Sequence, residues 1–204
     1  MSRVEIIGRI VKPILFGICL LPLVVLLFSD LGANPVEALT HATGDWALRF
    51  LLITLAINPL RRVSGWGDLV RLRRMLGLYA FFYACLHVVI YAVLDLGLQW
   101  ERIWDDVLKR PYITVGLSVF VMLIPLAITS TNGMMRRLGG RRWRRLHRLV
   151  YPAAVGAVLH FLWLVKADLR EPLMYFALLL LLFTARLLPW WRKRFALRAT
   201  APTI

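Results

Sequence analysis

The sequence predicts an all-α integral membrane protein, a helical bundle of six transmembrane helices with both termini on the cytoplasmic side. Three observations predict this class. Hydrophobic residues make up 60% of the 204 residues, well above the share in a soluble domain. Six apolar stretches have about the 17–25 residues that cross a bilayer as a helix. Basic residues collect in alternate connections between those stretches.

The six apolar stretches fill most of what we expect to be a single domain, residues 1–204. They cover residues 13–31, 43–60, 75–96, 111–129, 149–165 and 172–188. The first follows basic residues, as the apolar part of a signal peptide would, but no small-residue cleavage site follows it cleanly. We therefore expect an uncleaved first span.

The basic residues predict the orientation of the bundle. The N-terminus, the connections after the second and fourth spans, and the C-terminus hold 19 of the 26 Lys and Arg residues, whereas the other three connections hold five. Lys and Arg in short loops stay on the cytoplasmic side, so both termini are predicted to lie inside. All eight Trp residues lie at or just beyond span ends, as in the aromatic belts of membrane proteins. The net charge of +15 thus reflects topology, and a nucleic-acid partner is not expected.

The connection before the second span contains a helix start. Asn34 is suited to cap a helix, Pro35 to its first position, and Glu37 follows three residues after the cap. We expect a short outer helix there, ahead of the second span.

The connection before the fourth span has helical periodicity. Its apolar residues, Trp100, Ile103, Trp104, Val107 and Leu108, fall on one side of a helical wheel. This predicts an amphipathic helix on the outer membrane surface, which serves either as an interfacial connector or as a docking face for an outer partner.

Two histidines lie at the same depth in the third and fifth spans. His87 follows Met75 by 12 residues and His160 follows Arg148 by 12, so each lies about 18 Å from the cytoplasmic end of its helix. The two spans run in the same direction, so the imidazoles can face each other. They could ligate a haem iron, relay protons, or form a structural hydrogen bond. Zinc or copper would need more ligands than this depth offers.

Small residues near this histidine pair favour the haem interpretation, because a flat macrocycle needs room between helices. These residues are Ala84, Ala153, Ala154, Gly156 and Ala157. They also suit plain helix packing, so they do not exclude the other two interpretations. Cys19 and Cys85 lie inside apolar spans, and without a CxxC or CxxCH motif neither a disulfide nor covalently attached haem is expected.

A second cofactor level is feasible near the cytoplasmic surface. His147 precedes His160 by 13 residues, about 20 Å along an unbroken helix, and Pro152 between them can kink or rephase that helix. Arg73 and Arg74 share this level. Together with Arg145 they could pair with haem propionates or a flavin phosphate, or they could act only as cytoplasmic anchors.

Three other polar residues are not expected to form a site. His41 lies at the outer surface, as a solvated or capping residue. Arg49 is placed to form an ion pair with Asp45 four residues earlier. Arg186 is close enough to the inner edge of its span to snorkel toward water.

Four motifs resemble one known family. They are GANPVEALTHATGDWALRFLLITLAINPLRR, LRRMLGLYAFFYACLHVVIY, RPYITVG and RRWRRLHRLVYPAAVGAVLHFLW. Together they resemble the haem-binding membrane subunits of bacterial protein-methionine-sulfoxide reductase systems, the MsrQ or YedZ family. The likeness covers about residues 32–190. More distantly, the chain resembles the transmembrane part of ferric reductases and NADPH oxidases.

The resemblance implies a multi-pass inner-membrane protein with haem b and FMN. It also implies that electrons pass from the quinone pool or a cytoplasmic flavin reductase to a periplasmic molybdopterin-containing methionine sulfoxide reductase, which repairs oxidised proteins. The chain would then be an electron-transfer subunit and not the catalytic one. Another six-span cytochrome with a different acceptor, or a non-redox transporter or scaffold, are the competing interpretations.

The histidines that match the family motifs are His87, His147 and His160. The oxidase relatives stack two haems on two histidines from each of two helices, but the third span here offers only His87. The resemblance therefore implies one haem b between His87 and His160. A second haem would require His147 with an unusual sixth ligand, unless His147 instead helps to bind flavin.

Overall fold

The computed structural model describes the backbone of residues 3–165 and 167–199 and the side chains of residues 5–165 and 167–187. Throughout this part of the chain the regular structure is helical, without strands. The elements are α1 (Arg3–Ile6), the π-helix η1 (Ile7–Val11), α2 (Lys12–Phe28), α3 (Pro35–Ser64), the 3-10 turn η2 (Gly67–Leu69), α4 (Val70–Val89), the π-helix η3 (Ile90–Asp95), α5 (Trp100–Lys109), α6 (Pro111–Ile128), α7 (Asn132–Leu146), the 3-10 turn η4 (His147–Leu149), α8 (Val150–Leu164) and α9 (Arg170–Ala199).

Three helical segments within the described residues are long and apolar enough to cross a membrane. They are Ile7–Phe28, Gly67–Asp95 and Pro111–Ile128. These segments overlap the first, third and fourth predicted spans. Helices α3, α8 and α9 overlap the other three predicted spans, and the crossing of the bilayer by these helices stays a prediction. The cytoplasmic position of the C-terminus also stays a prediction, because residues 200–204 lie outside the described part.

The predicted helix start at Asn34 is confirmed, but the expected separate outer helix is not. The Asn34 side chain accepts a hydrogen bond from the Glu37 backbone N–H, and α3 then continues without a break to Ser64. Gly44 is the weakest helix former in the outer part of α3 after its first residue, Pro35. A single glycine costs about 1 kcal/mol in a helix, which is too little to end it. The outer helix and the second span are therefore one element, which ends at Gly65 with a φ of 69°.

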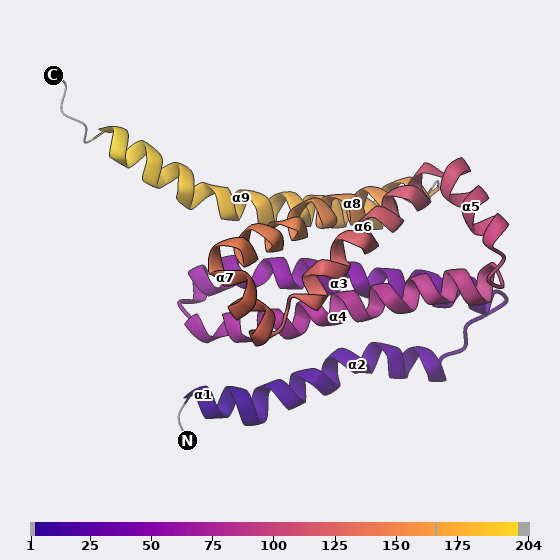
Figure 1. Cartoon of the computed structure of the whole chain (residues 1–204), viewed down its shortest axis with the longest axis horizontal. Coiled ribbons are helices and arrows are strands. Elements are labelled where there is room, and N and C mark those ends of the chain that lie inside the picture. The colour runs from indigo at the N-terminus through magenta and orange to yellow at the C-terminus, as the bar shows by residue number, and fades with distance from the viewer. Residues whose placement is uncertain (1–2, 166, 200–204) are drawn as a thin grey trace.

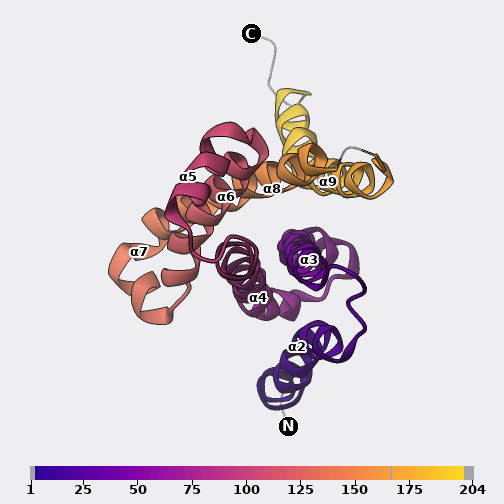
Figure 2. The same cartoon turned by 90° about the vertical axis from the view of Figure 1, so that its right-hand side faces the viewer.

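Helices α3 and α4 pack against each other at the centre of the bundle (Figures 1 and 2). Helix α2 lies on one side of this pair, while α6 and α8, which pack together, lie on the other. Leu55, Tyr83, Ala153 and Ala154 are fully buried between the helices. The two alanines of α8 allow its backbone to approach its neighbours closely.

Two tyrosines of α4 attach α2 to the rest of the bundle. Tyr79 donates its hydroxyl hydrogen to the Phe16 carbonyl at 2.9 Å. Tyr83 donates to the Cys19 carbonyl at 2.9 Å and accepts from the Leu23 N–H at 3.2 Å. The Tyr83 hydroxyl thus bridges a carbonyl and an amide that lie one turn apart on α2.

The elements outside the spans gather at the two ends of the bundle. The N-terminal helix α1, the α3–α4 turn and α7 lie at one end, and α5 with the α2–α3 connection lies at the other (Figure 1). The predicted helix at residues 100–109 is confirmed as α5. It exposes Trp100, Trp104 and Leu108 on the outside and turns Ile103 and Val107 inward.

The helix break expected near Pro152 occurs earlier in the chain. The 3-10 turn η4 separates α7 from α8, and Pro152 lies in the first turn of α8, where a missing N–H costs little. His147 opens η4 and His160 lies in α8, so the two histidines are on different elements.

Candidate functional site

A cavity of about 510 Å³ lies between α3, α4, α5, α6 and α8. This volume is within the range of roughly 300–1,000 Å³ that is typical of small-molecule and cofactor sites. Most of its lining is apolar, from residues such as Leu48, Leu51 and Phe120. His87 enters it from α4 and His160 from α8, and the two ring centroids are 6.2 Å apart with planes that cross at 81°.

Each imidazole binds a backbone carbonyl on a neighbouring helix through its Nδ1 atom. His87 Nδ1 lies 2.8 Å from the Thr40 oxygen on α3, and His160 Nδ1 lies 2.6 Å from the Tyr112 oxygen on α6. A carbonyl can only accept, so Nδ1 carries the hydrogen in both rings. Nε2 then keeps its lone pair, and no other described side chain or backbone group hydrogen-bonds to it. Metal-binding histidines are oriented in this way.

The spacing of the two rings suits one metal ion between them. Metal–imidazole bonds are about 2 Å long, so two rings that bind an ion from opposite sides have centroids about 6 Å apart. In the described part of the chain, no group of three or more His, Cys, Asp or Glu side chains is placed to hold a metal ion. Two axial imidazoles suit a haem iron, which takes its other four bonds from the macrocycle.

A glycine faces each imidazole. A Cβ atom on Gly44 would lie 3.0 Å from His87 Nδ1, and a Cβ on Gly116 would lie 2.8 Å from His160 Nδ1. Gly44 follows Thr40 by four residues and Gly116 follows Tyr112 by four, so each ring meets a carbonyl and a glycine one turn apart on one helix. Neither the glycines nor the carbonyls were predicted from the sequence.

The rim of the cavity is polar and mostly acidic. Glu37, Asp45 and Asp95 line it, and Arg110 is the only Lys or Arg among the described lining residues. His41, expected to be solvated, also lies at this rim, 3.8 Å from Glu37. Arg110 was not singled out from the sequence, because its place before the fourth span suggested only a surface residue.

One hydrogen bond of Asp106 attaches α5 to η3 at this rim: Tyr91 donates its hydroxyl hydrogen to Asp106 at 2.8 Å. Arg110, at the end of α5, forms an ion pair with the same carboxylate at 3.2 Å. Ile103 and Val107 of α5 then close that side of the cavity.

His147 does not line this cavity. Its Nε2 lies 3.0 Å from the Thr129 hydroxyl, which itself donates to the Pro125 carbonyl, so His147 Nε2 carries a hydrogen and donates. The ring stacks on Trp143 with centroids 3.9 Å apart. Burial and, to a smaller extent, the nearby Arg73 charge lower the pKa of His147, which lies just outside the predicted fifth span. The ring is therefore neutral near pH 7, with Nδ1 unprotonated.

The arginines predicted near the cytoplasmic level lie apart from the His87–His160 cavity. Arg73 is half-buried and close enough to affect His147. Arg74 donates to the Asn132 side chain at 2.8 Å, and Arg145 is exposed.

The two arginines interpreted as structural are bound within the bundle. Arg49 pairs with Asp45 at 3.7 Å, as predicted, and also donates to the Tyr175 hydroxyl at 2.7 Å. Arg186 does not snorkel outward as expected. Its guanidinium donates to the Leu55 carbonyl at 2.6 Å and to the Tyr151 hydroxyl, acceptors that α3 and α8 provide inside the bundle.

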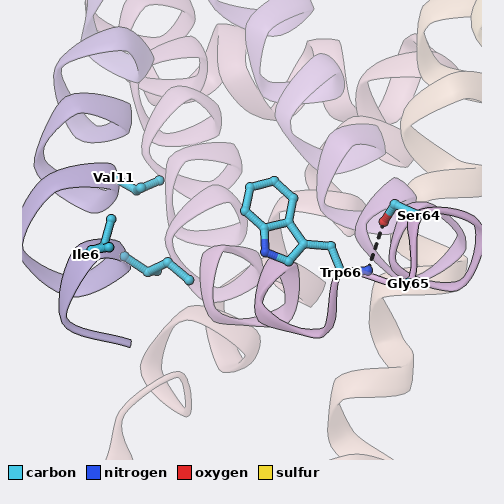
Figure 3. Close-up of a pocket in the computed structure, with 6 residues that line it drawn as sticks. Ile6, Val11, Ser64, Gly65 and Trp66 are labelled. Carbon is cyan, nitrogen blue, oxygen red and sulfur yellow. Dashed lines mark hydrogen bonds between the residues drawn. The ribbon is translucent and has the colours of Figure 1, made fainter. Parts of the chain in front are cut away.

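A second, more open cavity of about 600 Å³ lies between the N-terminal helix and the α3–α4 turn (Figure 3). It is lined by Ile6, Ile7, Val11, Ser64, Gly65 and Trp66. Its one side-chain hydroxyl, on Ser64, is already bonded to the Leu60 carbonyl and the Trp66 N–H. None of its described lining residues is ionisable.

Known proteins place the chain in a family. Residues 15–158 match the family of ferric reductase like transmembrane components. The chain is 53% identical over 197 residues to the protein-methionine-sulfoxide reductase heme-binding subunit MsrQ of Rhodospirillum rubrum, covering 95% of this chain and 93% of that protein. The protein of the same name from Herminiimonas arsenicoxydans is 50% identical over 200 residues, covering 95% and 92% of the two chains. The chain belongs to the MsrQ family.

A third relative has a higher identity over a shorter stretch. The MsrQ protein of Xanthomonas euvesicatoria pv. vesicatoria is 57% identical over 171 residues, covering 84% of this chain and 77% of that one. The MsrQ resemblance drawn from the four motifs is thus confirmed. The chain is a membrane component of the ferric reductase type, as its apolar helices also indicate.

Proposed function

We propose that the chain is a b-type cytochrome in which His87 and His160 are the axial haem ligands. The main support is the geometry of the two rings, whose centroids are 6.2 Å apart. Both rings carry their hydrogen on Nδ1, and their Nε2 atoms have no hydrogen-bond partner among the described residues. The names of the relatives, which describe heme-binding subunits, support the same ligand.

The function that follows is electron transfer. His87 and His160 would hold a haem from both sides and leave no ligand position for a substrate, and such a haem would supply one-electron transfer. The protein residues hold the two imidazoles in one tautomer, and the apolar lining around Leu51 and Phe120 excludes water from the cavity. Sulfoxide reduction then belongs to a partner.

We infer the direction of transfer from topology and family. A single domain spans the bacterial inner membrane six times, with both termini in the cytoplasm. Electrons enter from the quinone pool or a cytoplasmic flavin reductase and leave to a periplasmic molybdopterin-containing methionine sulfoxide reductase that repairs oxidised proteins. In support, the rim of the cavity lies beside α5, at the end of the bundle opposite the basic helix α7 (Figure 1).

A second cofactor belongs to the cytoplasmic level. We propose that His147 either ligates a second haem or contributes to an FMN site, with Arg73, Arg74 and Arg145 as partners of propionates or phosphate. The free Nδ1 of His147 and the proximity of Arg73 support this level.

The decisive experiment is a reduced-minus-oxidised absorption spectrum with haem quantification. The wild-type protein should show the low-spin spectrum of a b-type haem. His87→Ala and His160→Ala should each lose it, whereas His41→Ala, which removes the rim histidine, should retain it. If both ligand variants keep the wild-type spectrum, the axial pair is assigned wrongly. A wild-type protein without a Soret band after haem supply would instead favour a non-redox transporter or scaffold.

A further inference from the structure

The two imidazoles of the cavity are held by the same arrangement on two different helices. On α3, Thr40 supplies the carbonyl that accepts from His87, and Gly44 leaves the space that the ring occupies. On α6, Tyr112 and Gly116 do the same for His160. We propose that Gly44 and Gly116 are positioning residues that set the orientation of the axial histidines, an inference that rests on the proposed function.

The distances give the reason. A Cβ on Gly44 would lie 3.0 and 3.1 Å from two atoms of the His87 ring, and a Cβ on Gly116 would lie 2.8 Å from two atoms of the His160 ring. Carbon atoms in van der Waals contact are about 3.5–4.0 Å apart. A methyl group on Gly116 is therefore incompatible with the present His160 ring position, and one on Gly44 requires the His87 ring to move by a few tenths of an ångström. A helix backbone cannot move as easily as a side chain, so the imidazole is the part that shifts.

A shifted ring loses its orienting hydrogen bond. The contacts at both glycines include Nδ1 itself, the atom that donates to Thr40 or Tyr112. Moving it away from the carbonyl removes the contact that fixes the Nδ1–H tautomer and the direction of Nε2. The loss of such orienting partners typically weakens metal binding by about 10- to 100-fold.

Other glycines lack this contact and supply a matched control. Gly77 lies on α4, ten residues before His87, and a Cβ there would meet the Thr54 side chain at 3.6 Å, an ordinary contact distance. A Gly77→Ala variant therefore adds the same methyl group to a central helix without touching either imidazole.

The test compares purified full-length Gly44→Ala, Gly116→Ala and Gly77→Ala with the wild type. Haem affinity should fall by about 10- to 100-fold in the first two variants and stay at the wild-type value in the third. The reduced haem of the first two should also bind carbon monoxide, because a displaced imidazole opens an axial position, whereas wild type and Gly77→Ala should not bind it. Gly44→Ala carries the milder overlap and decides the matter if Gly116→Ala does not fold.

Three results would overturn the proposal, and they are separable. Wild-type affinity and no carbon monoxide binding in both site variants would show that the glycines do not position the rings. Lower haem content without carbon monoxide binding would show that the added methyl excludes the macrocycle and leaves the ring in place. A wild-type protein that binds no haem would instead refute the proposed function itself.

Discussion

At the scale of single residues, two imidazoles whose ring centroids lie 6.2 Å apart define the cavity, and each contacts one backbone carbonyl and one glycine of a neighbouring helix. Each ring thus depends on two residues that contribute no side-chain functional group to the site. The pairing of His87 with His160 was predictable, because depth along a helix follows from counting residues. Their hydrogen-bond acceptors, the Thr40 and Tyr112 carbonyls, could not be predicted, because every residue type has a backbone carbonyl. Gly44 and Gly116 were equally hidden, since a glycine in a membrane helix usually signals close helix packing.

Arg110 carries a prediction about the electrostatics of the cavity. It is the only described Lys or Arg of the lining, so Arg110→Gln removes the positive charge that helps to favour the reduced, less positive haem. The midpoint potential should fall by tens of millivolts. About 1 kcal/mol, the upper range for an exposed charge, corresponds to roughly 40 mV for one electron.

A redox titration followed by absorption measures this shift, with Lys109→Gln as the control. Lys109 is the neighbouring cation, pairs with Asp105 and is not part of the lining. Equal shifts in the two variants would mean that Arg110 acts only through the net charge of the outer end.

At the scale of elements, the sequence predicted the positions of helices better than their boundaries. The apolar periodicity of residues 100–109 was enough to predict α5, because apolar residues repeated at this spacing share one face only in a helix. The sequence did not predict that the outer helix and the second span form one helix, α3, because no sequence signal shows whether a helix continues between two predicted segments. The attachment of α2 through tyrosine hydroxyls was not predictable either, because it joins residues 60 or more positions apart.

This attachment makes Tyr83→Phe destabilising. The change removes the hydroxyl that bridges the Cys19 carbonyl and the Leu23 N–H, beside Pro22, whose missing N–H already weakens the helix there. Cys19 and Leu23 are four residues apart on α2, so their carbonyl and amide can still pair with each other within the helix. The loss is therefore that of the hydroxyl's own hydrogen bonds, about 0.5–1.5 kcal/mol each. We expect a lower thermal midpoint in detergent.

The control for this change is Ser118→Ala, which removes an exposed hydroxyl that bonds to the Thr114 carbonyl of its own helix. The thermal midpoint of each variant is measured by near-ultraviolet circular dichroism. A thermal midpoint of Tyr83→Phe no lower than that of Ser118→Ala would show that α2 is held mainly by apolar packing.

At the scale of the whole molecule, the distribution of Lys and Arg predicted that the basic connections lie together at one end of the bundle, and in the structure they do. The basic helix α7 and the α3–α4 turn share one end with α1, while α5 lies at the other. Hydropathy alone could not have ordered these ends, because it is symmetric across a bilayer. The excess of Lys and Arg at one end distinguishes the two sides of the membrane. The angles between the helices depend on side-chain packing, which the charge pattern does not predict.

The orientation itself can be tested with single cysteines. With Cys19 and Cys85 replaced by serine, Asp105→Cys introduces a thiol on exposed α5 and Arg141→Cys introduces one on exposed α7. If the basic end is cytoplasmic, a membrane-impermeant maleimide should label position 105 in intact spheroplasts and position 141 only after permeabilisation. Both positions should react fully in permeabilised membranes, which controls for accessibility. Labelling of position 141 alone in intact spheroplasts would invert the topology, place the cavity rim in the cytoplasm, and make delivery of electrons to a periplasmic partner impossible through this end.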